Sequence, residues 1–214
     1  MERNSLEKYV SAQVAWYGQS IIRITGRDGT VVWIDPFKVI EAAPKADLVL
    51  YTHPHRDHYT PRGLASVRKP GTRIVAPKGM GKLATDPLEP GESRSIAGIL
   101  VRAVPAYNAR GFPHAPGSGW LGYVVGIDGV SIYHPGDTDV IPDFSGAAPD
   151  IAFLPVVGLV TLKLEKAVEA ARRLGAGITI PIHYGMLPGT ANRGERFVRA
   201  YDGPAMLLRE RAPG

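Results

Sequence analysis

Four potential metal ligands lie within one stretch of six residues. Residues 53–58 read HPHRDH, and they follow an apolar run, residues 48–52, that is typical of a buried strand. In an extended or tightly turning segment, His53 and His55 fall on the same side, whereas Asp57 and His58 belong to a turn that can carry them elsewhere. One short segment can therefore serve two adjacent cations, and the fold around it must leave room for them.

The alternative is a polar loop with ordinary surface histidines. The chain has six histidines in 214 residues, and half of them lie in this segment beside an aspartate, which favours metal binding. Cysteine is absent, and this excludes disulfides, thiolate ligands and a cysteine nucleophile. Any metal must therefore be held by nitrogen and oxygen, a ligand set that suits zinc, manganese, iron or nickel.

The length of 214 residues fits one α/β domain, residues 1–214, better than two small ones. No apolar run approaches the about 20 residues that span a bilayer, and the charged N-terminus lacks the apolar core of a signal peptide. We therefore expect a soluble cytoplasmic protein. The net charge of +5 and a basic stretch over residues 62–82 weakly favour an acidic substrate. Nucleic acid is disfavoured, because basic and aromatic residues do not interleave.

Hydrophobic periodicity predicts many short strands and few helices. The expected strands are residues 12–17, 20–24, 31–34, 48–52, 73–76, 99–104, 121–127, 130–133, 150–154, 178–182 and 205–208. One expected helix begins at Pro61, with Thr60 as its cap. The others cover residues 78–84, 162–174 and 193–201. Residues 107–119 form a loop too long for a simple turn. This order of hairpins, mixed strands and a final βαβ unit predicts two mixed layers.

Further candidate ligands follow other predicted strands. Asp35, Asp137 and His183 each stand at a carboxyl end, where open sheets containing parallel strands gather their sites, and His114 lies in the long loop. Taken singly, Asp137 could cap a turn, His183 could sit at the rim of a strand and His114 could be a loop histidine. Together with residues 53–58, they complete the ligands of two cations.

At this point the chain resembles a known family. Residues 53–58 match the HxHxDH signature of the metallo-β-lactamase superfamily, residues 133–139 are similar to its bridging-aspartate motif, and residues 181–185 to its final histidine motif. Residues 16–20 and 33–36 are similar to its opening strands and early aspartate. Within the superfamily, the chain most resembles the branch that contains L-ascorbate-6-phosphate lactonase and uncharacterised metal-dependent hydrolases.

The resemblance implies an α/β fold, a four-layer αββα sandwich. It also implies two divalent cations, zinc first, with manganese or iron as alternatives. The implied ligands of the first cation are His53, His55 and His114, and those of the second are Asp57, His58 and His183. Asp137 would bridge the two cations, and Asp35 would support a ligand from behind.

We therefore expect a dinuclear hydrolase in which a metal-activated hydroxide attacks a lactone, ester or phosphodiester of a small anionic substrate. Asp57 would orient this hydroxide or accept its proton. His134 would protonate the leaving group, unless it is a packed histidine. The main alternative is a non-haem iron oxidoreductase of the same fold. A nucleic-acid-processing enzyme would need an extra domain, and a non-catalytic scaffold would leave the ligands without a purpose. No membrane partner is expected, and a homo-oligomer remains open.

Overall fold

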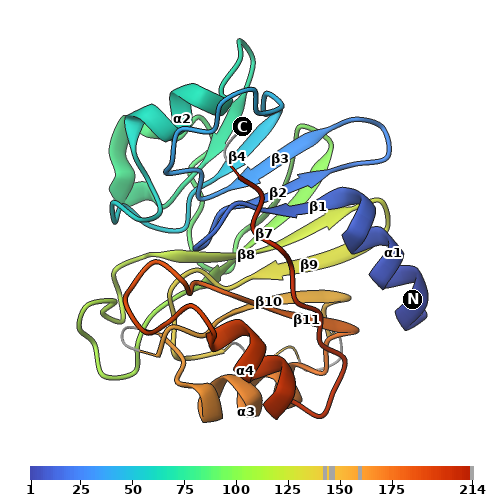
Figure 1. Cartoon of the computed structure of the whole chain (residues 1–214). Helices are drawn as coiled ribbons and strands as arrows, with labels where there is room; N and C mark the ends of the chain where they lie inside the picture. The colour runs from blue at the N-terminus through green and yellow to red at the C-terminus, as the bar shows by residue number, and fades with distance from the viewer. Residues whose placement is uncertain (142–143, 145–147, 159–160, 213–214) are drawn as a thin grey trace.

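Two β-sheets lie face to face, with helices on the outer side of each (Figure 1). A computed structural model of the chain describes residues 1–141, 144, 148–158 and 161–212. In Figure 1, helix α2 (Pro61–Val67) lies over the first sheet, and helices α3 (Leu164–Leu174) and α4 (Arg193–Ala200) lie under the second. The predicted four-layer αββα sandwich is therefore confirmed.

The first sheet has five strands in chain order. They are β1 (Val14–Trp16), β2 (Ile22–Thr25), β3 (Val31–Ile34), β4 (Leu48–Leu50) and β5 (Arg73–Val75). The first three strands form the two predicted antiparallel hairpins, and β3, β4 and β5 are parallel. Strands β3 and β4 are buried along their whole length, as strands covered on both faces should be.

The second sheet has six strands in the order β11-β10-β9-β8-β7-β6. They are β6 (Ser93–Ile96), β7 (Ile99–Pro105), β8 (Leu121–Ile127), β9 (Val130–His134), β10 (Ile151–Pro155) and β11 (Ile178–Ile182). Strands β6 to β9 are antiparallel, whereas β9, β10 and β11 are parallel. Helix α3 joins β10 to β11 and packs against β10, which makes the predicted βαβ unit.

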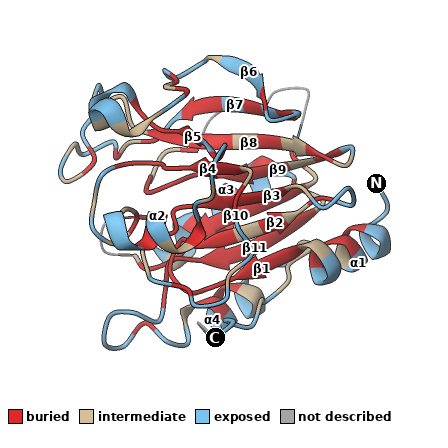
Figure 2. Ribbon diagram, turned by 90° about the horizontal axis from the view of Figure 1, so that it is seen from above, coloured by how far each residue is buried: buried red, intermediate tan, exposed pale blue. Residues whose placement is uncertain are grey.

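Alternation along the strands divides the core into two clusters. Val32 and Ile34 face the second sheet and join the large cluster between the sheets, whereas Val31 and Trp33 join a smaller cluster under α2. Figure 2 shows the consequence: the strands other than β6 are largely buried, while α1 and α2 each expose one side.

The parallel strands fix the place of the functional site. Asp35 follows β3, His53 follows β4 after a short link, Asp137 follows β9 and His183 follows β11. Because the carboxyl ends of neighbouring parallel strands meet at one edge, each sheet delivers ligand-type side chains to the same end of the sandwich.

Two expectations about the elements were wrong. Helix α1 (Arg3–Gln13) takes the place of the first residues of the expected 12–17 strand. Leu6, Tyr9 and Val10 give it an apolar face, but no capping side chain marks its start. Residues 205–208 are not a strand, because only an isolated bridge joins Ala205 to Thr179.

Two smaller differences concern the middle of the chain. Strand β6 was not predicted, since three of its four residues are exposed and polar. The expected helix 78–84 is a 3-10 helix, Lys78–Leu83, that is kinked at Gly81. Among the described residues, no helix combines the length and the apolar character that crossing a membrane would require.

Candidate metal centre

A tight turn after β4 arranges the four ligand-type residues of the first sheet. The carbonyl of His55 accepts hydrogen bonds from the backbone N–H groups of His58 and Tyr59, at 3.0 and 2.9 Å. The turn places Asp57 Oδ2 3.8 Å from His183 Nε2, but it keeps the ring of His58 3.9 Å from that of His53. The Nε2 atom of His53 and the Nδ1 atom of His55 lie 3.1 Å apart.

Asp35 and Thr52 hold two of these histidines from behind. Asp35 accepts hydrogen bonds from the backbone N–H of Thr52 at 2.8 Å, from its hydroxyl at 2.7 Å, and from His58 Nδ1 at 2.7 Å. Because the Thr52 hydroxyl donates to Asp35, its oxygen can accept from His53 Nδ1, which lies 2.9 Å away. Both imidazoles then carry their proton on Nδ1, and their Nε2 atoms are left to face a cation.

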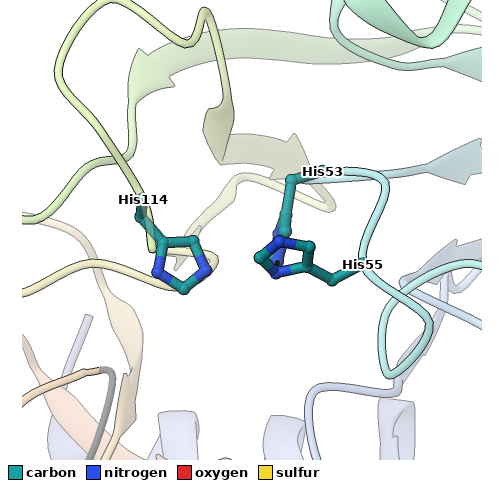
Figure 3. Close-up of side chains that lie close together, drawn as sticks. All are labelled: His53, His55 and His114. Atoms are coloured by element: carbon teal, nitrogen blue, oxygen red, sulfur yellow. Dashed lines mark hydrogen bonds between the residues drawn. The ribbon is translucent and has the colours of Figure 1, made fainter. Parts of the chain in front are cut away.

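The second sheet supplies three more side chains from three separate segments. His114 lies in the loop between β7 and β8, Asp137 follows β9, and His183 follows β11. Figure 3 shows the His114 ring facing the rings of His53 and His55 across the gap between the two loops. All three side chains are at least 97% buried, with exposed fractions of 1%, 3% and 3%.

The seven predicted ligands come together around Asp137. Its Oδ1 atom lies 3.3 Å from His58 Nε2 and 3.0 Å from His183 Nε2, whereas its Oδ2 atom lies 3.5 Å from His114 Nε2. Three sets of donor atoms lie within 4.8 Å of one another. These sets are His53, His55 and His114; Asp57, His58 and His183; and His53, His58 and Asp137.

The donor atoms fit a cation better than they fit one another. In the described part of the chain, the buried Nε2 atom of His114 has no hydrogen-bond partner. An unsatisfied buried polar atom is unfavourable, and a metal ion in the centre would satisfy it. Gly136 lets the turn before Asp137 pass close to β8. A Cβ at this position would meet Leu121 O at 2.9 Å, and the φ of +64° suits glycine.

Burial and neighbouring charges set the protonation of the centre. Burial lowers the pKa of His53 well below its usual value and lowers the pKa of His114 to about 4. Burial alone would lower the pKa of His58, but the carboxylates of Asp137 and Asp35 outweigh it and raise that pKa. Burial would raise the pKa of Asp137, yet His183 and His58 hold it well below its usual range. Asp137 is therefore ionised, and His53 and His114 are neutral, as cation binding requires.

His134 already uses both ring nitrogens in hydrogen bonds to the backbone, so neither is free to protonate a leaving group. Its Nε2–H donates to the carbonyl of Ser20 at 3.0 Å, and its Nδ1 accepts from the backbone N–H of Gly136 at 3.2 Å. The side chain is completely buried, and burial lowers its pKa. Both ring nitrogens serve the backbone, which favours the packed histidine among the two sequence-based alternatives.

Three residues of the centre escaped the sequence analysis. Thr52 carries the hydrogen bonds described above. The ring centroid of Trp120 lies 4.9 Å from that of His53 and 5.2 Å from that of His114, so Trp120 covers one side of the centre. Gln19 donates from Nε2 to Asp57 Oδ2 at 3.2 Å. A tryptophan or glutamine in a turn carries no spacing signal, so only the fold could reveal these contacts.

Three of the six basic residues in the stretch 62–82 are paired with acidic side chains among the described residues. Lys69 pairs with Asp47 at 2.6 Å, Lys78 pairs with Glu89 at 2.6 Å, and Arg73 forms an ion pair with Asp86. These partners lie close in space but are distant enough in the sequence to be missed. The stretch therefore gives little support to an anion-binding role.

The two facing sheets, with histidine and aspartate donors gathered where the strands end, define a metal-dependent enzyme of the αββα class. A family model described as the β-lactamase superfamily domain matches residues 13–183. A UPF0173 metal-dependent hydrolase of Methanoculleus marisnigri is 31% identical over 89% of this chain and 88% of its own length. The chain belongs to the metallo-β-lactamase superfamily and, within it, to the UPF0173 metal-dependent hydrolases. It is an enzyme, a metal-dependent hydrolase.

Solved structures agree with this assignment. A metal-dependent hydrolase from Parabacteroides distasonis superposes with a TM-score of 0.75 and 29% identity, over 92% of each chain. CmlA, a diiron β-hydroxylase from Streptomyces venezuelae, superposes with a TM-score of 0.71 and 16% identity, over 92% of this chain and 52% of its own. The likeness to CmlA concerns the fold alone.

Proposed function

We propose that this hydrolase works with two divalent cations held by the seven ligands of the centre. His53, His55 and His114 would hold the first cation, and Asp57, His58 and His183 the second. The position of Asp137 carries the proposal, because its two oxygens face histidines of both sets, at 3.0–3.5 Å. A carboxylate can bind two cations through two oxygens, whereas a neutral imidazole nitrogen binds one.

The protein's own residues would divide the chemical work. Two bound divalent cations would supply hydroxide at neutral pH and polarise the substrate carbonyl or phosphoryl oxygen. The side chain of Asp57 is 33% exposed, against 3% for Asp137, so Asp57 is the carboxylate that can meet both water and substrate. We assign to Asp57 the orientation of the attacking water and the acceptance of its proton. Zinc is our first choice of cation, followed by manganese and iron.

The proposed substrate is a small anionic lactone, ester or phosphodiester, in keeping with the lactonase-like branch that the sequence resembles. A cavity of about 600 Å³ adjoins the centre at Asn108, whose side chain lies 3.3 Å from His114 Nδ1. Within the residues that the structure describes, its lining has four basic side chains, Arg110, Lys163, Lys166 and Arg173, and two acidic ones, Asp139 and Glu169, of which Glu169 pairs with Lys166 at 2.7 Å. The basic side chains of the cavity would attract a carboxylate or phosphate group of the substrate.

Elemental analysis followed by a substrate screen tests the proposal. The purified protein should contain two divalent cations per chain and should hydrolyse members of a panel of lactones, phosphodiesters and thioesters. One cation at saturation would contradict the dinuclear site. Oxygen consumption by the iron-loaded protein, with no hydrolysis by the zinc-loaded protein, would favour an iron oxidoreductase instead.

Arg110→Ala tests the anionic substrate. Since Arg110 is exposed, losing its attraction should cost about 1 kcal/mol, which raises KM about three- to tenfold and leaves kcat unchanged. Arg62→Ala is the matched control, because Arg62 is also exposed but lies on α2 and does not line the cavity. Equal KM values for both variants would argue against binding of the substrate anion at this cavity.

A further inference from the structure

The side chain of Gln19 reaches into the second set of ligands. Gln19 lies in the turn between β1 and β2, and its exposed fraction is 5%. Its Nε2 atom lies 3.2 Å from Asp57 Oδ2 and 3.0 Å from His183 Nε2. These two atoms belong to different sheets, and the amide of Gln19 contacts both.

The spacing of the two ligands is close to what a cation requires. Asp57 Oδ2 and His183 Nε2 lie 3.8 Å apart. Two ligands of a tetrahedral zinc ion, bonded at about 2.0–2.2 Å, lie about 3.3–3.6 Å from each other. Gln19 thus holds Asp57 through its side-chain amide and His183 through its backbone carbonyl, near the separation at which both ligands can bind one ion.

The backbone of Gln19 also contacts the segment of His183. Its carbonyl accepts hydrogen bonds from the backbone N–H of His183 and from Trp16 Nε1, both at 2.9 Å. Gln19 and His183 both have a left-handed backbone, with φ of +50° and +58°. Such conformations are unfavourable for residues other than glycine and tend to occur where function demands them.

The remaining polar atom of Gln19 also points to a role at the centre. In the described part of the chain, its buried Oε1 atom has no hydrogen-bond partner. A glutamine needed only to connect the two sheets could use both ends of its amide, as buried polar groups usually do. The unsatisfied oxygen indicates that water or a cation at the centre completes its environment.

We propose that Gln19 is a positioning residue for the second cation. It strengthens the binding of this cation because it holds Asp57 and His183 together across the two sheets. This inference rests on the proposed dinuclear site and adds to it a residue that is not one of the seven ligands. It makes the affinity of the second set of ligands depend on the β1–β2 turn, while the first set is independent of it.

Cobalt titration of the metal-free full-length protein tests this role, because bound Co²⁺ is observed by its visible absorption as well as by calorimetry. Gln19→Gly removes the side chain and accepts the left-handed backbone without strain. The second of two binding steps should weaken about 10- to 100-fold, the usual effect of losing a residue that orients a metal ligand. The first step should stay unchanged.

A second variant and a control make the result specific. Gln19→Asn suits the left-handed backbone but is one methylene shorter, so it should lose second-step affinity as Gln19→Gly does. It also decides the matter if Gln19→Gly does not fold. Gln13→Ala removes the other glutamine of the chain, at the end of α1, and should bind like the wild type.

The outcomes separate this inference from the function on which it rests. Two unchanged binding steps in the folded Gln19 variants would overturn the role of Gln19 alone. An equal loss in both steps would indicate a general structural defect and would also overturn it. A wild-type protein that binds a single Co²⁺ would contradict the dinuclear function itself.

Discussion

The two sheets build their shares of the centre in different ways. The first sheet supplies four ligand-type side chains from one turn, residues 53–58, and Asp35 and Thr52 at the adjacent strand ends hold two of them, His53 and His58. The second sheet supplies His114, Asp137 and His183 singly, from segments separated by whole strands and helices. The first share is therefore set by local chain geometry, whereas the second depends on strand order and on the packing of the two sheets.

Asp137→Asn should give the largest effect, because it removes the charge that both halves of the centre share. Loss of several kcal/mol of stabilisation corresponds to a fall in kcat/KM of about 10³-fold or more. Steady-state hydrolysis, with metal content measured in parallel, is the assay. Asp128→Asn, in the turn before β9, is the control and should retain activity. Near-normal turnover by Asp137→Asn would break the proposed link between the halves.

His55→Ala and His114→Ala compare the two sheets directly, because each removes one ligand of the same set. Each should abolish tight binding of the first cation and hydrolysis. The double variant should be little worse than either single one, since the ligands act as a unit. Metal titration measures both effects. Full turnover by a metal-free His55→Ala protein would contradict metal-dependent hydrolysis, and strictly additive losses would mean that the two residues bind separate ions.

Asp35→Asn tests how strongly the ligands of the first sheet depend on the hydrogen bonds that Asp35 accepts. The amide cannot replace the carboxylate that accepts from both Thr52 and His58, so metal affinity should fall about 10- to 100-fold. Asp47→Asn is the control in the same sheet, since Asp47 accepts from Val31 N and pairs with Lys69, away from the centre. Equal metal affinities in the two variants would show that Asp35 does not stabilise the metal ligands.

Gly136→Ala should have the smallest effect on chemistry and a measurable effect on stability. The positive φ and the close approach to Leu121 O should together cost about 2–3 kcal/mol, against about 1 kcal/mol at Gly129, where φ is also positive but the space is open. Thermal unfolding should show a Tm lower by several degrees for Gly136→Ala than for Gly129→Ala. Equal Tm values would mean that the second sheet tolerates movement of the Asp137 turn.

Much of the fold could be predicted because the strands are short, apolar and separated by turn residues. The βαβ unit of β10, α3 and β11 follows from an amphipathic helix that ends at Gly175. Helix α1 was missed because its apolar face is narrow, and β6 was missed because its residues are mostly polar and exposed. The 205–208 segment has a strand-like composition, but it forms only one bridge with β11.

The sequence by itself determined the kind of donor atom and the position of the first four, because ligand chemistry depends on residue type and a turn of six residues has few conformations. It also placed Asp35, Asp137 and His183 at strand ends. Only the tertiary structure decided that Asp137 faces histidines of both sets, that His134 is bonded to backbone on both nitrogens, and that Gln19 reaches Asp57 and His183. The contacts of Gln19 join residues more than thirty positions apart, and their geometry follows from sheet packing, which no local pattern encodes.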